Sequence, residues 1–292
     1  MRKNSQTLTT QSIPALIKQL AIPASIGMFF NTMYNVVDTF YAGLISTQAI
    51  SALTLSFMIF FLIIGFGYGF SSAITALLGN ALGKKRYKLA SIYAHKGLVF
   101  VPLIGLTLSI IGYFFAPSLF MFLGAKDEYL QISLDYINPI LFGAIFFMFN
   151  FSLNSILIAT GDTKTYRNSL IFGFFANLAL NPLFMYGFLF VPAMGIKGIA
   201  FATVLIQIIN MFYLFYKVLQ TKLIHFEKLE YFIPNLRIYK QFVIQGIPSS
   251  LNMLTMAVGS LILTYFVSHY GMYAVAGYGI GYRVEQLMLL PA

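Results

Sequence analysis

Hydrophobic stretches of about 20 residues recur along almost the whole chain, and they limit the folds that it can adopt more than any other feature. Each stretch is long enough to cross a hydrocarbon core of about 30 Å as a helix. The chain is 59% hydrophobic and only 9% charged, whereas soluble globular domains carry roughly 25% charged residues. The expected fold class is therefore an all-α polytopic membrane protein.

Seven membrane spans and the start of an eighth are predicted from the apolar stretches. They cover residues 20–43, 50–78, 89–115, 129–159, 168–190, 198–216, 242–270 and 273–292. The polar segment before the first stretch is too long for a signal peptide, so the first span is expected to be retained. The chain contains no cysteine, which excludes disulfides and thiolate chemistry.

The net charge of +10 follows the predicted topology and does not indicate nucleic acid as a partner. Lysine and arginine gather in alternate loops, at Lys84, Lys85, Arg86 and Lys88, then at Lys164 and Arg167, and again between residues 217 and 240. The opposite loops carry only Lys126 and Lys197. This bias matches the positive-inside rule, which places the N-terminus in the cytoplasm and makes the lipid bilayer the surrounding partner.

The chain divides at a long polar stretch, residues 217–241, which is predicted to be a cytoplasmic linker. It separates a six-helix lobe, residues 1–216, from the beginning of a second lobe, residues 242–292. A shift of 225 positions sets Ala21–Ser25 on Gly246–Ser250 and so aligns Pro23 with Pro248. Chance similarity between apolar helices is the alternative. A parallel repeat is typical of transporters with a site between two halves. Because the second copy stops after about one and a half spans, the sequence is interpreted as a partial polypeptide.

Asp38 is an ionisable residue inside the first predicted span. Asn31, Tyr34, Asn35 and Asp38 are spaced three and four apart and therefore lie along one helical face. A carboxyl group inside a membrane is costly, so by default it faces a cavity or a partner and has a function. The alternative is an aspartate that snorkels to the outer interface.

The fifth predicted span offers partners for Asp38 in Asn177 and Asn181, which are four residues apart. An asparagine amide can satisfy either protonation state of a carboxyl group. Pro182 cannot donate a backbone hydrogen bond, which predicts a free carbonyl near Leu178. Carboxylate, amide oxygens and a free carbonyl would suit a proton or a small cation, and ordinary hydrogen bonding between helices is the alternative.

Other polar residues inside the spans carry weaker predictions. Asn150 and Asn154 share one face of the fourth span, where they either line a solute cavity or serve packing. Lys96 is expected to snorkel to the cytoplasmic surface. Arg283 and Glu285 are expected to point into the bundle.

Enzymatic activity is not expected from these residues. His95, His225 and His269 are scattered, and neither HExxH nor GxSxG occurs in the sequence. The glycine runs GFGYG and GYGIG lie inside apolar spans, which favours close helix contacts over phosphate loops.

Several longer motifs together resemble the multidrug and toxic compound extrusion family. They are NVVDTFYAGLIST, GNALGKKRYKLA, ATGDTKTYRNS, NLALNPLFMYG, GIKGIAFAT and HYGMYAVAGYGIGYRVEQLMLLPA. The resemblance implies a fold of twelve helices in two lobes, of which this chain is similar to the first lobe and part of the second. It implies export of amphiphilic or cationic compounds in exchange for H⁺ or Na⁺, without a cofactor, by a monomer in the bacterial inner membrane.

The resemblance also assigns roles to residues. Asp38 matches the coupling carboxylate, Tyr34 a residue one turn before it, and Pro23 the bend of the first helix. Asn177 and Thr203 match further positions of the coupling site, and with Asp38 and Asn181 they form a possible Na⁺ site.

Asn181 departs from the family pattern, because many members have aspartate there. One carboxylate must then do what two do elsewhere, which weakens the case for a tight sodium site and leaves proton and sodium both open. Two alternatives to a drug exporter remain, a flippase for lipid-linked precursors in the same larger group and a membrane fragment without transport activity.

Overall fold

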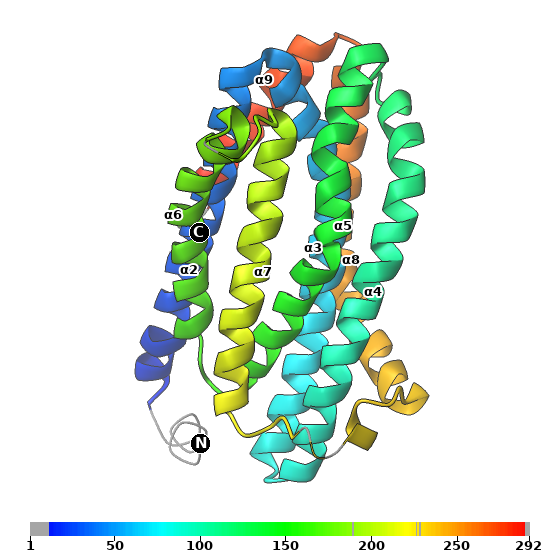
Figure 1. The fold of residues 1–292 in the computed structure, drawn as a ribbon. Helices are drawn as coiled ribbons and strands as arrows, with labels where there is room; N and C mark the ends of the chain where they lie inside the picture. The colour runs from blue at the N-terminus through cyan, green and yellow to red at the C-terminus, as the bar shows by residue number, and fades with distance from the viewer. Residues whose placement is uncertain (1–11, 189, 226, 228, 290–292) are drawn as a thin grey trace.

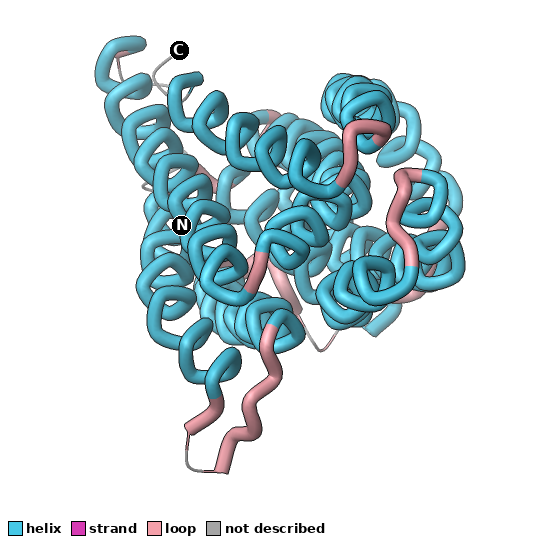
Figure 2. Tube along the Cα trace, turned by 90° about the horizontal axis from the view of Figure 1, so that it is seen from above, coloured by secondary structure: helices cyan, strands magenta, loops and turns pink. Residues whose placement is uncertain are grey.

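The computed structural model describes residues 12–188, 190–225, 227 and 229–289, and these residues form an almost wholly helical bundle (Figures 1 and 2). The α-helices are α2 (Ile13–Ile45), α3 (Thr47–Gly83), α4 (Tyr87–Phe122), α5 (Asp127–Ala159), α6 (Lys164–Tyr186), α7 (Ile196–Gln220), α8 (Leu236–Ser268) and α9 (Met272–Leu289). A short 3₁₀ helix, η1 (Leu229–Tyr231), lies between α7 and α8. The all-α fold class is confirmed.

Seven of the described helices, α2 to α8, are long and apolar enough to cross a membrane. The first seven predicted spans each correspond to one of them. The predicted eighth span corresponds to α9, which has 18 residues and is not among the seven. Residues 290–292 of that predicted span lie outside the described residues.

The predicted end of the fifth span is wrong, because α6 ends at Tyr186 and not at residue 190. Gly187 follows with a φ of 76°, a left-handed conformation that glycine adopts without steric cost and that stops the helix. Gly187, Phe188 and Phe190 therefore belong to the loop after α6.

Helix α3 lies at the centre of the bundle and packs most extensively against α8 and α5. The glycines of the GFGYG run make this close approach possible. A Cβ atom at Gly69 would lie 2.6 Å from the backbone nitrogen of Ser250 in α8, and one at Gly67 would collide with the Phe151 ring in α5. The prediction that the glycine runs serve helix contacts is confirmed for GFGYG. In GYGIG it holds only for Gly279, whose added Cβ would meet Thr54 of α3, because no atom of the described residues lies within 4 Å of a Cβ added at Gly277 or Gly281.

Helix α2 packs against α6, and α7 packs against both α5 and α6 (Figure 1). The C-terminal halves of α2 and α6 and the N-terminal half of α7 consequently meet at one end of the bundle. Asp38, Asn177 and Thr203 come from these three segments.

The connection between α7 and α8 runs along α4 and is held there by side chains of α4. The Ser91 hydroxyl donates to the Leu223 carbonyl at 2.6 Å, and the backbone N–H of His225 donates to Nε2 of His95 at 3.0 Å. The Lys96 ammonium donates to the carbonyls of Glu230 and Ile233.

The prediction that Lys96 extends to the cytoplasmic surface is therefore wrong. It is only 5% exposed, because carbonyl groups of the connection replace water around its charge. Within the predicted linker, 217–241, α7 continues to Gln220 and α8 already begins at Leu236. Residues 226 and 228 of this segment lie outside the described part of the chain.

Candidate functional site

Asp38 of α2 lies inside the bundle with its carboxyl group held by donors from two other helices. It is 4% exposed, and its Oδ1 accepts hydrogen bonds from Nδ2 of Asn177 and Nδ2 of Asn181, both at 2.8 Å. Both asparagines are fully buried, with no exposed surface. The structure therefore brings together the carboxyl group and the two amides that the sequence pattern paired with it, and Asp38 does not snorkel to the interface.

Thr203 and Tyr34 complete the polar network on the other carboxyl oxygen. The Thr203 hydroxyl donates to Oδ2 of Asp38 at 3.4 Å, while the Tyr34 hydroxyl donates to Oγ1 of Thr203 at 3.0 Å. A threonine hydroxyl has one hydrogen and two lone pairs, so it can serve both bonds at once. Tyr34 thus orients the hydroxyl that reaches Asp38.

The donor atoms around Asp38 fit a proton or a small hard cation. Asn181 also donates to Oδ1 of Asn177 at 3.2 Å, but its own Oδ1 is buried without a hydrogen-bond partner among the described residues. A buried amide oxygen beside a carboxylate and a hydroxyl matches the oxygen ligands that hard cations prefer. The groups that bond to Asp38 are uncharged amides and a hydroxyl, so a proton or cation bound at Asp38 would meet no second carboxylate among them.

The carbonyl of Leu178 is not part of this site, contrary to the prediction. Pro182 does leave it without a helical donor, but the Tyr41 hydroxyl of α2 donates to it at 3.1 Å. Tyr41 lies almost one turn beyond Asp38 on α2, so the same helix pair supplies both contacts. The free carbonyl is thereby used for packing between α2 and α6.

Asn31 and Asn35 stay on α2 and do not join the Asp38 network. Asn35 donates to the backbone carbonyl of Asn31 at 2.8 Å, and Asn31 itself is exposed. The predicted helical face is present, but these two amides bond within their own helix or face outward. Pro23 is buried inside α2, which continues through it as one helix. A cavity role for the two asparagines and a bend at Pro23 remain predictions.

Asn150 connects α5 to α7. Its Nδ2 donates to the backbone carbonyl of Gln207 at 2.9 Å and to the Gln207 side chain at 2.8 Å. Asn154 is also buried, and its Oδ1 has no hydrogen-bond partner in the described chain. The contacts of Asn150 are those of packing, and a solute-binding role for this pair stays a prediction.

Two neighbours of Asp38 were missed by reasoning from the sequence. Tyr136 of α5 is buried, and both it and Arg283 of α9 interact electrostatically with the Asp38 carboxyl group. No spacing signal could identify them, because each depends on which helices become neighbours. Arg283 is buried as expected, but Glu285 is exposed, so the prediction that both point into the bundle is wrong for Glu285. Two residues apart on a helix, they cannot share a face.

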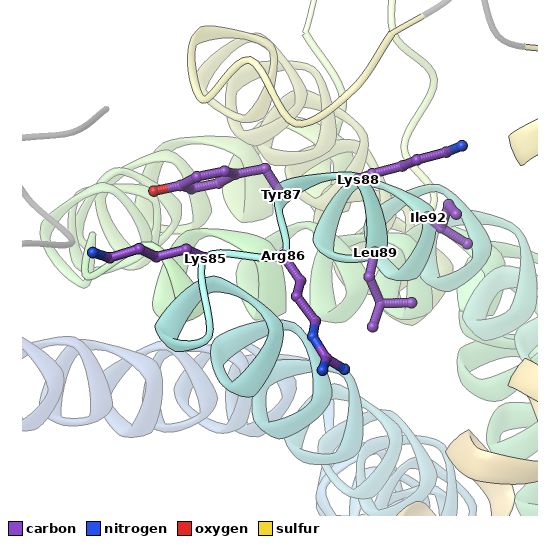
Figure 3. Close-up of a pocket in the computed structure, with 6 residues that line it drawn as sticks. All are labelled: Lys85, Arg86, Tyr87, Lys88, Leu89 and Ile92. Carbon is purple, nitrogen blue, oxygen red and sulfur yellow. The ribbon is translucent and has the colours of Figure 1, made fainter.

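A second feature is an open hollow at the turn between α3 and α4, lined by Lys85, Arg86, Tyr87, Lys88, Leu89 and Ile92 (Figure 3). It lies at the end of α3 opposite to the α2–α3 turn, and it contains none of the predicted site residues. Its basic side chains are exposed. They match the basic loop that the sequence places on the cytoplasmic side.

Comparison with known proteins identifies the family. The MatE family model matches residues 23–183, which is more than half of the chain and includes Asp38 of α2 and Asn177 and Asn181 of α6. The chain belongs to the MatE family. The resemblance to the multidrug and toxic compound extrusion family is thus confirmed.

Relatives in the MatE family match over nearly all of the chain. A "probable multidrug resistance protein YoeA" of Bacillus subtilis (strain 168) is 29% identical over 302 residues, covering 100% of this chain and 65% of that protein. An inward-facing structure of a multidrug resistance MATE family transporter is 28% identical with a TM-score of 0.82, covering 94% of this chain and 62% of the other. An outward-facing structure is 27% identical with a TM-score of 0.81, covering 99% and 64%.

These MatE comparisons support two structural conclusions. The chain spans less than two thirds of the length of each of these three proteins. The TM-scores to the inward-facing and outward-facing structures are nearly equal, so the described helices resemble neither conformation more than the other. The chain is a multi-pass membrane protein of this family.

Proposed function

We propose that this chain takes part in secondary active efflux, in which amphiphilic or cationic compounds leave the cell in exchange for H⁺ or Na⁺ bound at Asp38. In this proposal the protein is a monomer in the bacterial inner membrane, with a cytoplasmic N-terminus. The family membership and the multidrug resistance relatives support the class of substrate.

The observation that carries the proposal is a buried carboxyl group with uncharged donors on both of its oxygens. Asn177 and Asn181 bond to Oδ1 and Thr203 to Oδ2. An ionisable residue inside a membrane bundle by default marks an ion pathway or a proton relay. Among the described residues, Asp38 forms no salt bridge that would neutralise it permanently.

Alternating access couples the two fluxes in this proposal. Binding of a proton or cation removes the charge of Asp38 and so lowers the cost of enclosing this part of α2. The empty, charged form favours a state that is open to a cation, and the neutralised form favours the other state. Such coupling requires the ion to bind one state more tightly than the other, since an ion that binds both equally shifts nothing.

Asp38→Asn tests the role of the carboxyl group. The purified chain would be reconstituted in liposomes, and export of ethidium would be recorded with an imposed proton gradient and, separately, with a sodium gradient. Asparagine preserves the size of the side chain but removes the titratable group, so we expect gradient-driven ethidium transport to be lost.

Asp135→Asn is the matched control, because it removes the carboxyl group that pairs with Lys197 at 3.2 Å and lies outside the Asp38 network. This variant should keep its gradient-driven transport. Coupled transport by Asp38→Asn at the rate of the unmodified chain would disprove the proposal.

A further inference from the structure

Arg283 of α9 is a buried cation with few partners. It is 7% exposed, and its Nη1 donates to the Gly279 carbonyl of its own helix at 2.9 Å. Its Nε has no hydrogen-bond partner among the described residues. A guanidinium group carries five N–H donors, so most of its hydrogen-bonding capacity is unused within the described chain.

A buried charge of this kind requires compensation, because removing a cation from water is costly unless it is paired. Within the described residues no carboxylate forms a salt bridge with Arg283. Helix α9 contacts α2, but the two carboxyl oxygens of Asp38 already accept hydrogen bonds from three other side chains. Glu285 is exposed and lies on another face of α9.

One aromatic ring lies against the guanidinium group, and further rings pack beside it. The Arg283 Cζ atom lies 5.5 Å from the centroid of the Phe57 ring in α3, a cation–π contact. Phe57 also packs against Phe61 and Tyr282, with ring centroids 4.6 and 6.0 Å apart, and Tyr282 stacks on Tyr278. Phe57, Tyr278 and Tyr282 are each partly exposed, so the three rings are not fully covered by the described chain.

We propose that Arg283, Phe57, Tyr278 and Tyr282 form a subsite for flat aromatic solutes that carry an acidic group. The rings would stack on the solute, and the free N–H donors of Arg283 would bind its carboxylate or phosphate oxygens. The subsite lies between α3 of the first predicted lobe and α9 of the second. This subsite rests on the proposed function, because it names a class of transported solute. The negative charge of Asp38 alone would disfavour an acidic solute.

Three probes with one aromatic scaffold test this subsite, namely 9-anthracenecarboxylate, 9-anthracenemethanol and 9-anthracenemethylammonium. They differ in charge but share the same rings. Binding to the chain in lipid nanodiscs would be followed by probe fluorescence, which no tryptophan of this chain can disturb. Empty nanodiscs correct for partition into lipid. We expect the carboxylate to bind about tenfold more tightly than the alcohol, as charge-assisted hydrogen bonds are stronger than neutral ones.

Arg283→Gln should remove this preference, so that carboxylate and alcohol bind equally. Arg237→Gln, an exposed arginine at the start of α8, is the matched control and should keep the preference. Phe57→Ala should weaken the binding of all three probes by a similar factor, because it removes a stacking surface and leaves the charge of Arg283. Asp38→Asn should not weaken the binding of the carboxylate probe, because it removes a neighbouring negative charge.

An unchanged ratio of carboxylate to alcohol affinity in Arg283→Gln would overturn the subsite, provided that the variant elutes as the unmodified chain does in size-exclusion chromatography. If Arg283→Gln fails this check, Arg283→Lys replaces it. Lysine keeps the charge but lacks the planar donors, so we expect a lower ratio of carboxylate to alcohol affinity, and an unchanged ratio would overturn the subsite. The binding ratio needs no ion gradient. Loss of the subsite is therefore distinguishable from failure of Asp38 to couple transport.

Discussion

Pro182 of α6 leaves a backbone carbonyl without its helical hydrogen bond, and a side chain of α2 donates to that carbonyl. Proline has no backbone N–H, so the carbonyl of Leu178 loses its helical hydrogen bond. The Tyr41 hydroxyl restores one at 3.1 Å. The same turn of α6 presents Asn177 and Asn181 to Asp38. The contact of Tyr41 therefore fixes the rotation and height of α6 relative to α2 right beside the candidate site.

Tyr41→Phe should destabilise the chain by about 0.5–1.5 kcal/mol, the usual net contribution of one hydrogen bond. In a Pro182→Ala background the same change should cost little, because the backbone N–H of residue 182 can then bond to Leu178. The measurement is the free energy of unfolding of the four variants in a double-mutant cycle, by denaturant titration in micelles. If Tyr41→Phe lowered the free energy of unfolding equally in both backgrounds, its effect would not come from the hydrogen bond to the Leu178 carbonyl.

At the scale of elements, the connection between α7 and α8 is held on α4 by buried polar side chains. His95 is fully buried, and its ring packs edge-on against Tyr231 and Phe232 with centroids 5.5 and 4.7 Å away. Lys96 bonds to carbonyls at Glu230 and Ile233. The connection is thus attached to α4 and restrains the start of α8.

Lys96→Met should release this attachment, since methionine keeps much of the length and apolar contact but cannot donate to carbonyls. Amide hydrogen exchange followed by mass spectrometry should show faster exchange in residues 221–235. Lys88→Met is the control, as Lys88 is exposed on the same helix and bonds to none of the described residues of the connection. Unchanged exchange of this segment in Lys96→Met would mean that the packing of His95 holds it without Lys96.

The elements differ in how far the sequence could predict them, for physical reasons. Helices α2 to α8 follow from apolar runs, since a backbone in hydrocarbon must satisfy its hydrogen bonds internally. Asn177 and Asn181 could be paired with Asp38 because a spacing of four sets two amides on one face. The partners of Tyr41 and Arg283 could not be found this way, because they depend on which helices become neighbours.

At the scale of the whole molecule, the contact between α3 and α8 joins the two predicted lobes. Gly69 lies within this contact, where an added Cβ would meet Gly246 and Ser250. Gly69→Ala should therefore destabilise the chain by about 1–3 kcal/mol through overpacking. Gly79→Ala is the control on the same helix, because nothing lies within 4 Å of its added Cβ. That change should stabilise α3 by up to about 1 kcal/mol. Unfolding titrations that give both variants the same stability would argue against a tight α3–α8 contact.

The orientation of the whole bundle in the membrane can be tested with single cysteines, because the natural chain has none to interfere. Lys84 and Lys126 are both exposed, and they lie in the loops at opposite ends of α4. The charge bias predicts that Lys84→Cys is cytoplasmic and that Lys126→Cys faces outward. A membrane-impermeant maleimide should therefore label Lys126→Cys in intact cells, and Lys84→Cys only after the cells are opened.

The attachment of the α7–α8 connection to α4 adds a constraint that charge bias alone does not contain. Ser91 and His95 lie close to Lys84 along the chain and bond to Leu223 and His225, so this connection must be on the side of the membrane where Lys84 lies. Lys222→Cys should consequently be labelled under the same conditions as Lys84→Cys, whichever way the bundle is inserted. Labelling of Lys222→Cys together with Lys126→Cys would contradict the packing of the connection on α4. If Lys84→Cys and Lys222→Cys were both labelled in intact cells, the orientation predicted from the charge bias would be wrong. The packing of the connection on α4 would still hold.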